Sequence, residues 1–348
     1  MRNPESTGRE WTNRHFRVNW LATMLPKNSA DYRTILWALA MPVVMLVQFR
    51  NPSLIKYMWP LGCYMALAAG VIAHNHLHTP TFKGKRMNQF FGTWLSVFYG
   101  YPTFAWMPTH NLNHHKYLNK AGDATITWRY GNKNTVWIAA TYFFVSSYYQ
   151  AGPIKEYIRK AKENNPKLYR HIMTQYAVWG GTYACLIALA IAWHGPLLGI
   201  YTVGLATGLP VFFALWTIML FNYMQHVHTD PWSEHNHSRN ITGRIFNFLV
   251  FNAGLHTAHH ENPGAHWSKL PEYHAQVADK VHPDIQEPSF LWWVFRAYVL
   301  SAFFPSFETK QLGRAPFDAP DTKSALTSVA PVTDTVDALE AGNNAQMA

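Results

Sequence analysis

The chain has 348 residues and a mean hydropathy of −0.14, a value that by itself would suit a soluble protein. Its residues are nevertheless 49% hydrophobic and only 14% charged, and the net charge of +10 is spread over long polar stretches without a dense basic run. This distribution argues against a nucleic-acid partner, and two cysteines, Cys63 and Cys185, are too few for a disulfide framework or a Cys-based zinc site.

Four stretches without Asp, Glu, Lys or Arg approach the length of a membrane span. They are Thr34–Phe49, Tyr57–Ala73, His171–His194 and Gly195–Phe221. Short links join the first to the second and the third to the fourth, so the sequence predicts two helical hairpins. Because the first two stretches are short, we expect those helices to continue past their apolar parts.

The fold class expected is an all-α integral membrane protein, with a cytoplasmic helical cap added to the four transmembrane helices. Of the 29 Lys and Arg residues, only Arg50 and Lys56 lie in the two short turns. The positive-inside rule therefore predicts that both termini and the long central loop are cytoplasmic. Three interrupted apolar stretches are expected to be interfacial or re-entrant helices: Phe90–Met107, Thr135–Gln150 and Ile245–Asn252.

We expect three parts along the chain: a cytoplasmic segment at residues 1–33, a membrane domain at 34–311 and a tail at 312–348. The tail is rich in Ala, Thr, Asp, Pro and Ser and has no hydrophobic period, which predicts disorder.

Histidine is concentrated in two windows that flank the apolar stretches, and 19 His occur in all. The patterns are H-x-x-x-H at His74–His78, H-x-x-x-H-H at His110–His115, H-x-x-H-H at His256–His260, and N-x-x-x-H at Asn222–His226. Residues three or four apart share a helical face. Each of the pairs His74 with His78, His110 with His114, and His256 with His260 can therefore bind one metal or bridge to a second. His115 should point about 100° away from His114, as should His259 from His260. Even numbers of membrane crossings separate the patterns, which places all of them at the cytoplasmic surface.

Grouped imidazoles indicate a metal site, and Zn, Cu, Fe and Ni all accept imidazole. Zinc usually takes four ligands, so eight or nine His are too many for one zinc ion. Two iron ions with several imidazoles each would use the whole set and leave positions open for dioxygen.

The three boxes resemble the signature of the membrane fatty acid desaturase and hydroxylase superfamily, in order and in spacing. The resemblance covers roughly residues 34–300. It implies a fatty acyl desaturase in which two Fe ions, reduced by an external donor, activate O2 and an acyl chain loses two hydrogens. The metal ligands it implies are His74, His78, His110, His114, His115, His226, His256, His259 and His260.

The stearoyl-CoA desaturase branch also has an Asn-x-x-x-His pattern, which Asn222 and His226 match. By this resemblance His226 binds iron directly and Asn222 binds it through water. The first box here is H-x-x-x-H and contains an additional histidine, His76. That branch usually has four residues between the two histidines of its first box. Double-bond position and head-group preference are therefore not carried over.

The sequence contains no His-Pro-Gly-Gly haem signature, so electrons are expected from a separate ferredoxin-, rubredoxin- or cytochrome-type donor with its reductase. The substrate expected is an acyl lipid, an acyl-CoA or an acyl carrier protein conjugate, taken up beside membrane lipid. Residues near the boxes could hydrogen-bond the outer nitrogens of the ligands; they are His76, His228, Asp123, Asp230 and Glu261.

Two other functions fit parts of this pattern. A hydroxylase, ketolase or decarboxylating oxygenase would use the same boxes and metal. A His-rich metal transporter would need ionisable groups along a path through the bilayer, whereas the four apolar stretches contain no Asp, Glu, Lys or Arg and carry His only at their ends.

Overall fold

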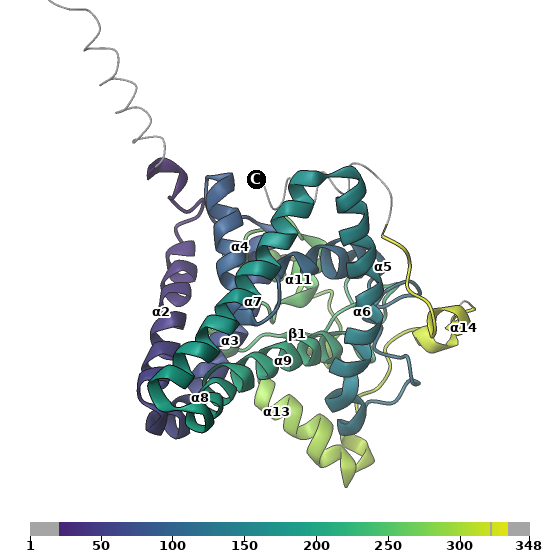
Figure 1. Cartoon of the computed structure of the whole chain (residues 1–348). Coiled ribbons are helices and arrows are strands. Elements are labelled where there is room, and N and C mark those ends of the chain that lie inside the picture. Colours follow the sequence, from purple (N-terminus) through teal and green to yellow (C-terminus); the bar gives the residue numbers. More distant parts are fainter. Residues whose placement is uncertain (1–20, 321, 333–348) are drawn as a thin grey trace, which may run out of the picture.

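The computed structural model describes residues 21–320 and 322–332 of the chain (Figure 1). Within them the fold is almost entirely helical, and four helical units are long and apolar enough to cross a membrane. The predicted class, an all-α membrane protein with four spans, is confirmed. Residues 1–20 and 333–348, parts of the expected N-terminal segment and tail, lie outside the described residues.

The first hairpin consists of α2 (Asp31–Arg50) and α3 (Ile55–His78), joined by the short helix η1 (Pro52–Leu54). Both helices continue past their apolar parts, as expected. The extension matters most in α3, which runs beyond Ala73 to His78, so that the first histidine box lies on its last turn.

The second hairpin consists of α7 (Pro166–His194) and a unit that begins with α8 (Pro196–Val203). That unit continues through a π-helical turn, η4 (Gly204–Gly208), into α9 (Leu209–His226). Gly195 makes the turn with φ of +78°, a conformation that L side chains rarely adopt. A Cβ atom at Gly199 would lie 2.7 Å from the backbone of Ala190, so glycine allows α7 and α8 to pack closely.

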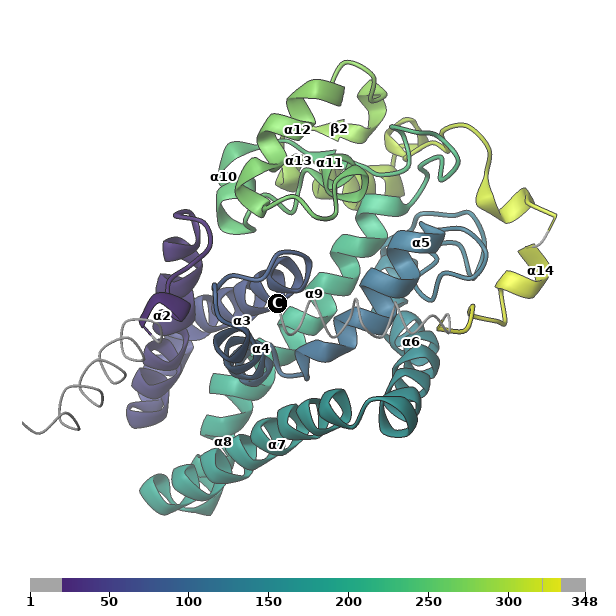
Figure 2. The same ribbon diagram turned by 90° about the horizontal axis from the view of Figure 1, so that it is seen from above.

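Helices α3 and α9 form the centre of the molecule and make extensive contact with each other. Small residues on α3, among them Ala69 and Gly70, let Ala214 and Ile218 of α9 approach. Helix α4 (Lys85–Tyr99) packs on α3 and α7, and α6 (Val136–Asn164) packs on α9 and α7. Seen from above, α9 passes between α3 and α4 on one side and α6 on the other (Figure 2).

Two of the three expected interfacial helices begin near the predicted residues but end elsewhere. Helix α4 ends at Tyr99, and η2 (Thr103–Ala105) follows it, whereas α6 continues well past Gln150. The third corresponds to α10 (Arg244–Leu249).

The chain after α9 forms short elements, of which α10 to α13 gather on one side of that helix while α14 lies apart, beyond α5 and α6 (Figure 2). Strands β1 (Asn240–Ile241) and β2 (Gln286–Glu287) pair in parallel, with Asn240 opposite Gln286. The helices of this part are α11 (His256–Glu261), η5 (Trp267–Lys269), α12 (Leu270–Val277), η6 (Pro283–Ile285), α13 (Phe290–Val294), η7 (Phe295–Val299), η8 (Leu300–Ala302), η9 (Pro305–Phe307), η10 (Pro316–Asp318) and α14 (Thr322–Ala325).

The beginning of the expected disordered tail is packed in this structure. Ala325 and Val332 are buried, and their backbone carbonyls accept hydrogen bonds from Arg129 and Lys160, each at 2.8 Å. These contacts involve backbone oxygens, which any sequence offers, and therefore leave no signature in the composition of the tail.

Candidate metal centre

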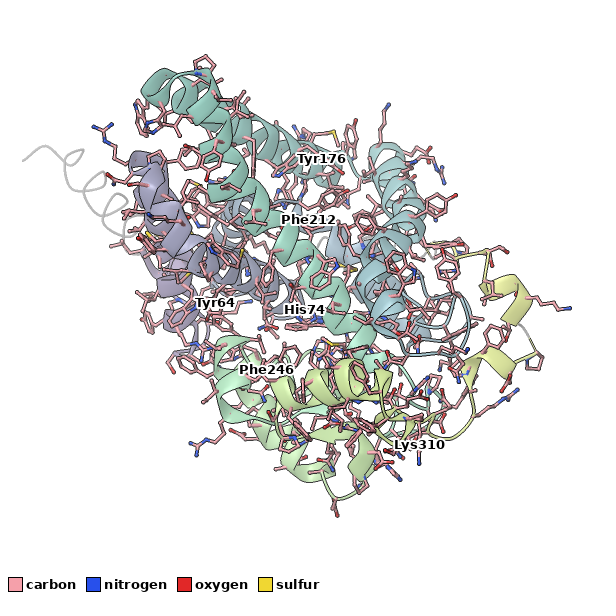
Figure 3. All side chains as sticks on the ribbon, turned by 90° about the horizontal axis from the view of Figure 1, so that it is seen from below. Tyr64, His74, Tyr176, Phe212, Phe246 and Lys310 are labelled. Carbon is pink, nitrogen blue, oxygen red and sulfur yellow. The ribbon has the colours of Figure 1, made fainter. Side chains whose placement is uncertain are left out.

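The histidine boxes lie at helix ends that the fold brings to one place. His74 and His78 lie on the last turn of α3, and His226 ends α9. His110 and His114 lie on the π-helix η3 (Met107–His114), His115 begins α5 (His115–Tyr117), and the third box forms most of α11. His74 lies in the interior of the molecule beside α9 (Figure 3).

The imidazoles form two groups in which all ligand nitrogens lie within 4.8 Å of one another. We call them group A, made of His74, His78, His110 and His259, and group B, made of His114, His226, His256 and His260. The ring of His115 adjoins group A, because its Nε2 lies 3.0 Å from Nε2 of His110 and 3.1 Å from Nε2 of His259. The structure thus gathers all nine predicted imidazoles into one double cluster.

The π-helix decides which histidines of the second box act together. In η3 the backbone N–H of His115 bonds to the carbonyl of His110, five residues earlier, so the turn is wider than an α-turn. Residues five apart then share a face, and His115 accompanies His110 while His114 turns toward group B. Of the two arrangements open to His110 and His114, one metal for both or one metal each, the structure favours the second, with His110 in group A and His114 in group B. The pairs His74 with His78 and His256 with His260 do share a group.

Burial keeps these rings in the form that binds metal. The pKa values of His110, His115, His256, His259 and His260 are lowered well below the ordinary value, first by burial and then by the neighbouring imidazoles. A neutral imidazole offers a lone pair to a cation, whereas a protonated one does not. These five rings therefore have the protonation that metal binding requires at neutral pH.

The hydrogen bonds of group B leave two lone pairs directed at each other. Nδ1 of His114 donates to Oδ2 of Asp123 at 2.8 Å, and Nδ1 of His226 donates to the carbonyl oxygen of His237 at 3.1 Å. In a neutral ring the other nitrogen then carries no proton, yet the two Nε2 atoms lie 3.1 Å apart. In group A, the buried Nε2 of His78 has no hydrogen-bond partner among the described residues. A cation accounts for both arrangements, so the residues fit a metal in each group.

Asp123 is the carboxylate that orients a ligand. It is fully buried, and it accepts hydrogen bonds from the backbone N–H groups of Asn119 and Thr125 at 2.8 and 2.7 Å. Burial alone would raise its pKa, but His114 and the hydrogen bonds from His114 and Thr125 lower it below the ordinary value. An ionised Asp123 holds His114 in the Nδ1–H tautomer, with Nε2 free for metal.

The other four candidates for this outer role have hydrogen bonds elsewhere. His76 contacts Thr81 and the carbonyl of Asn88, and His228 contacts the carbonyls of Asn132 and Thr309. Asp230 accepts from the N–H of Trp232, and Glu261 pairs with His235 at 2.8 Å. These bonds stabilise turns around the cluster, and among the described residues they involve none of the nine imidazoles.

Two residues that contact the ligands were missed by the sequence analysis. The hydroxyl of Thr125 lies 3.0 Å from Nδ1 of His114, and Oδ1 of Asn75 lies 3.1 Å from Nδ1 of His74. Asn75 adjoins His74 in the first box, so its position was a usable signal. The sequence contained no such signal for Thr125, because only the fold of the loop brings it to His114.

An apolar cavity adjoins both groups and ends at Asn222. It encloses about 690 Å³ of space, including its opening, and His74, His110, His256 and His259 lie on its wall. The remaining wall is mostly apolar and includes Val71, Ile218, Phe221 and Leu270. The amide of Asn222 donates to the hydroxyl of Tyr142 at 2.9 Å, which fixes its side chain at this wall.

A second cavity continues from the first toward α6 and α7. It encloses about 1120 Å³ including open solvent, and both cavities are bounded by Trp106, Thr109, Gln150 and Met219. Tyr101, Lys155 and Tyr176 line its outer part. The two cavities therefore share part of their walls, and the first of them places mostly apolar surface beside the imidazoles.

Four membrane-length helices and nine converging imidazoles define a membrane protein with a histidine-ligated metal centre. The chain matches the family described as fatty acid desaturase over residues 55–292, more than half of its length. The chain belongs to the fatty acid desaturase family and is a membrane oxidoreductase. No curated protein and no solved structure matches the chain.

Proposed function

We propose that this protein is an oxygen-dependent acyl-chain desaturase in which groups A and B each hold one iron ion. The observation that supports this most directly is the position of the imidazoles, at the wall of a mostly apolar cavity. Pockets of this kind bury an apolar ligand and place few polar groups against it. The polar residues at this cavity are the four imidazoles, Asn222 and five other uncharged side chains: Asn75, Thr109, Thr125, Gln150 and Gln225.

When bound, iron would supply the activation of dioxygen with electrons from an external donor. In the balanced reaction, a –CH2–CH2– unit, O2, two electrons and two protons give –CH=CH– and two water molecules. The electrons come from a ferredoxin-, rubredoxin- or cytochrome-type donor. The substrate is an acyl chain carried as a lipid, as acyl-CoA or on acyl carrier protein.

The residues of this chain would position the reactants. Ile218, Phe221 and Met219 provide an apolar surface for methylene groups and exclude water from them. Asp123 and the carbonyl of His237 fix the two group B rings that face each other. Asn222 lies on the same cavity wall, where its side chain would hold a water molecule beside the metal.

Expression in a host with a known lipid profile tests this function. The total acyl chains of cells with and without the protein would be compared by mass spectrometry. A product that has lost two hydrogens and is absent with the His256→Ala variant supports the proposal. A product that has gained one oxygen atom would establish a hydroxylase on the same scaffold. An unchanged acyl profile together with altered cellular zinc or iron would favour metal transport.

A further inference from the structure

A second apolar depression lies on the outside of the helices and shares no lining residue with the cavities at the imidazoles. It is formed by α2, α4 and α7, and it encloses about 1740 Å³ including open solvent. We call it the α4–α7 groove. Its apolar lining includes Met45, Phe90, Trp94, Phe98, Leu168 and Val178.

The helices that form the groove are fixed relative to one another by hydrogen bonds. Nε1 of Trp94 donates to the carbonyl of Ala38 on α2 at 3.2 Å. The hydroxyl of Tyr183 on α7 donates to the carbonyl of Val97 at 3.0 Å. Because these are contacts between helices, the groove is a built feature of the fold and its width is set by the bundle.

The groove is basic at one end only. Lys167, Arg170 and His171, from the first turns of α7, line it together with the apolar residues, and no acidic residue lines it among the described ones. Lys167 and Arg170 are exposed, and neither forms an ion pair with a carboxylate in the described part of the chain. Lys85 and Arg86, also exposed, lie one turn before Gln89, which lines the groove from α4.

This distribution matches an amphipathic ligand with a negative end. Basic side chains at a membrane surface attract anionic head groups, at about 1 kcal/mol for each Lys or Arg. Apolar walls along membrane-length helices suit acyl chains, and the exposed Phe90 and Val178 show that the groove opens toward the surroundings of these helices. The other polar residues that line the groove, Gln89, Thr93, Thr174 and Thr182, are uncharged, so the charge is confined to the basic end.

We propose that the α4–α7 groove binds one anionic phospholipid. Lys167 and Arg170 hold its phosphate, and its acyl chains lie along α4 and α7. The lipid is a structural ligand separate from the substrate, because the groove and the catalytic cavities have no wall in common.

Titration of the detergent-purified, full-length protein tests this assignment. The probes are phosphatidylglycerol, phosphatidylcholine of the same acyl chains, and inorganic phosphate, and native mass spectrometry counts the lipid bound per chain. We expect saturable binding of one phosphatidylglycerol molecule. The double variant Lys167→Ala/Arg170→Ala should bind it at least about tenfold more weakly, since two phosphate contacts are removed.

Two further variants separate the head group from the tails. Lys280→Ala/Lys310→Ala removes the same charge from exposed positions outside the groove, and Lys310 lies at the edge of the molecule (Figure 3); this variant should bind normally. Thr174→Trp places an indole on the groove wall with every charge kept, and it should weaken lipid binding.

Equal affinity for the two lipids, or equal losses in the two double variants, would overturn the proposal. The proposal would also be overturned if inorganic phosphate displaced the lipid and the Thr174→Trp variant bound the lipid normally, because the site would then recognise phosphate and not the acyl chains. None of these measurements depends on product formation.

Discussion

The Nε2 atoms of His114 and His226 lie 3.1 Å apart, while Nδ1 of each ring contacts an acceptor on the opposite side, the Asp123 carboxylate or the His237 carbonyl. A metal ion near both Nε2 atoms would use this arrangement, because the outer hydrogen bonds hold Nδ1 protonated and leave Nε2 as the nitrogen that can bind. This arrangement favours group B as a metal site more strongly than the number of histidines does. It also explains why the partners of the outer nitrogens, Asp123 and the His237 carbonyl, are buried.

Replacing His226 tests group B directly. His226→Ala should lower the iron content by about half and abolish product, because group B would lose one of its four ligands. His228→Ala is the matched control, since within the described residues the His228 ring hydrogen-bonds to the carbonyls of Asn132 and Thr309 and to the Thr309 hydroxyl, and to none of the nine imidazoles. It should retain iron and product. Iron analysis of both variants would contradict the assignment if the His228 variant were the one that lost metal.

Asp123 should affect metal binding without touching metal. In Asp123→Asn the side chain keeps its size but loses the charge that holds the proton on Nδ1 of His114. Metal affinity should fall about 10- to 100-fold, as for other residues that orient a ligand. The measurement is iron retained per chain after dialysis against graded chelator concentrations. Asp230→Asn, whose carboxylate caps Trp232, serves as the control, and equal retention in the two variants would refute the orienting role.

At the scale of helices, hydrophobic stretches and proline or glycine positions predict much of the fold. The four spans, their two hairpins and the extension of α3 to His78 all follow from apolar length and turn residues. The π-helix does not follow, because Met107–His114 has no residue pattern that distinguishes an i→i+5 turn from an α-turn. The sequence therefore left open whether His110 and His114 belong to one group or to two, although every predicted imidazole lies in the cluster.

Packing of separate elements accounts for the rest of what could not be predicted. Thr125 reaches His114, and the backbone of residues 325–332 reaches Arg129 and Lys160, only through the tertiary fold. Gly204 and Gly208 have the spacing of a helix-packing motif, yet a Cβ atom at Gly204 would meet nothing within 4 Å. They form the π-helical turn η4 instead.

The packed part of the tail supports the loop that contains Asp123. Arg129 donates to the carbonyls of both Asp123 and Ala325, and the N–H of Ala330 donates to Gly122. Ending the chain after Gln311 would remove these partners and should cost about 1 kcal/mol for each lost hydrogen bond. We expect a lower melting temperature and weaker retention of iron. Ending it after Val332 keeps the contacts and is the control; identical melting of the two truncations would show that the contacts contribute nothing.

At the scale of the whole molecule, the charge distribution makes a prediction about orientation. Arg50 and Lys56 are the only basic residues in the turns of the two hairpins, so both turns should lie outside the cell membrane and both termini inside. A C-terminal reporter that is active only in the cytoplasm should be active, and the same reporter inserted after Gly195 should not. The reverse pattern would invert the topology and place the metal centre on the outer face.

Helix α11 has only six residues, yet it supplies a ligand to both halves of the cluster, His259 to group A and His256 and His260 to group B. When translation has reached the end of α9, His114 and His226 of group B have been synthesised, whereas His256 and His260 have not. Group A therefore lacks a member until His259 is synthesised, and group B lacks one until His260. All four spans precede these residues in the chain, so neither half of the cluster can be completed before the last span has been made.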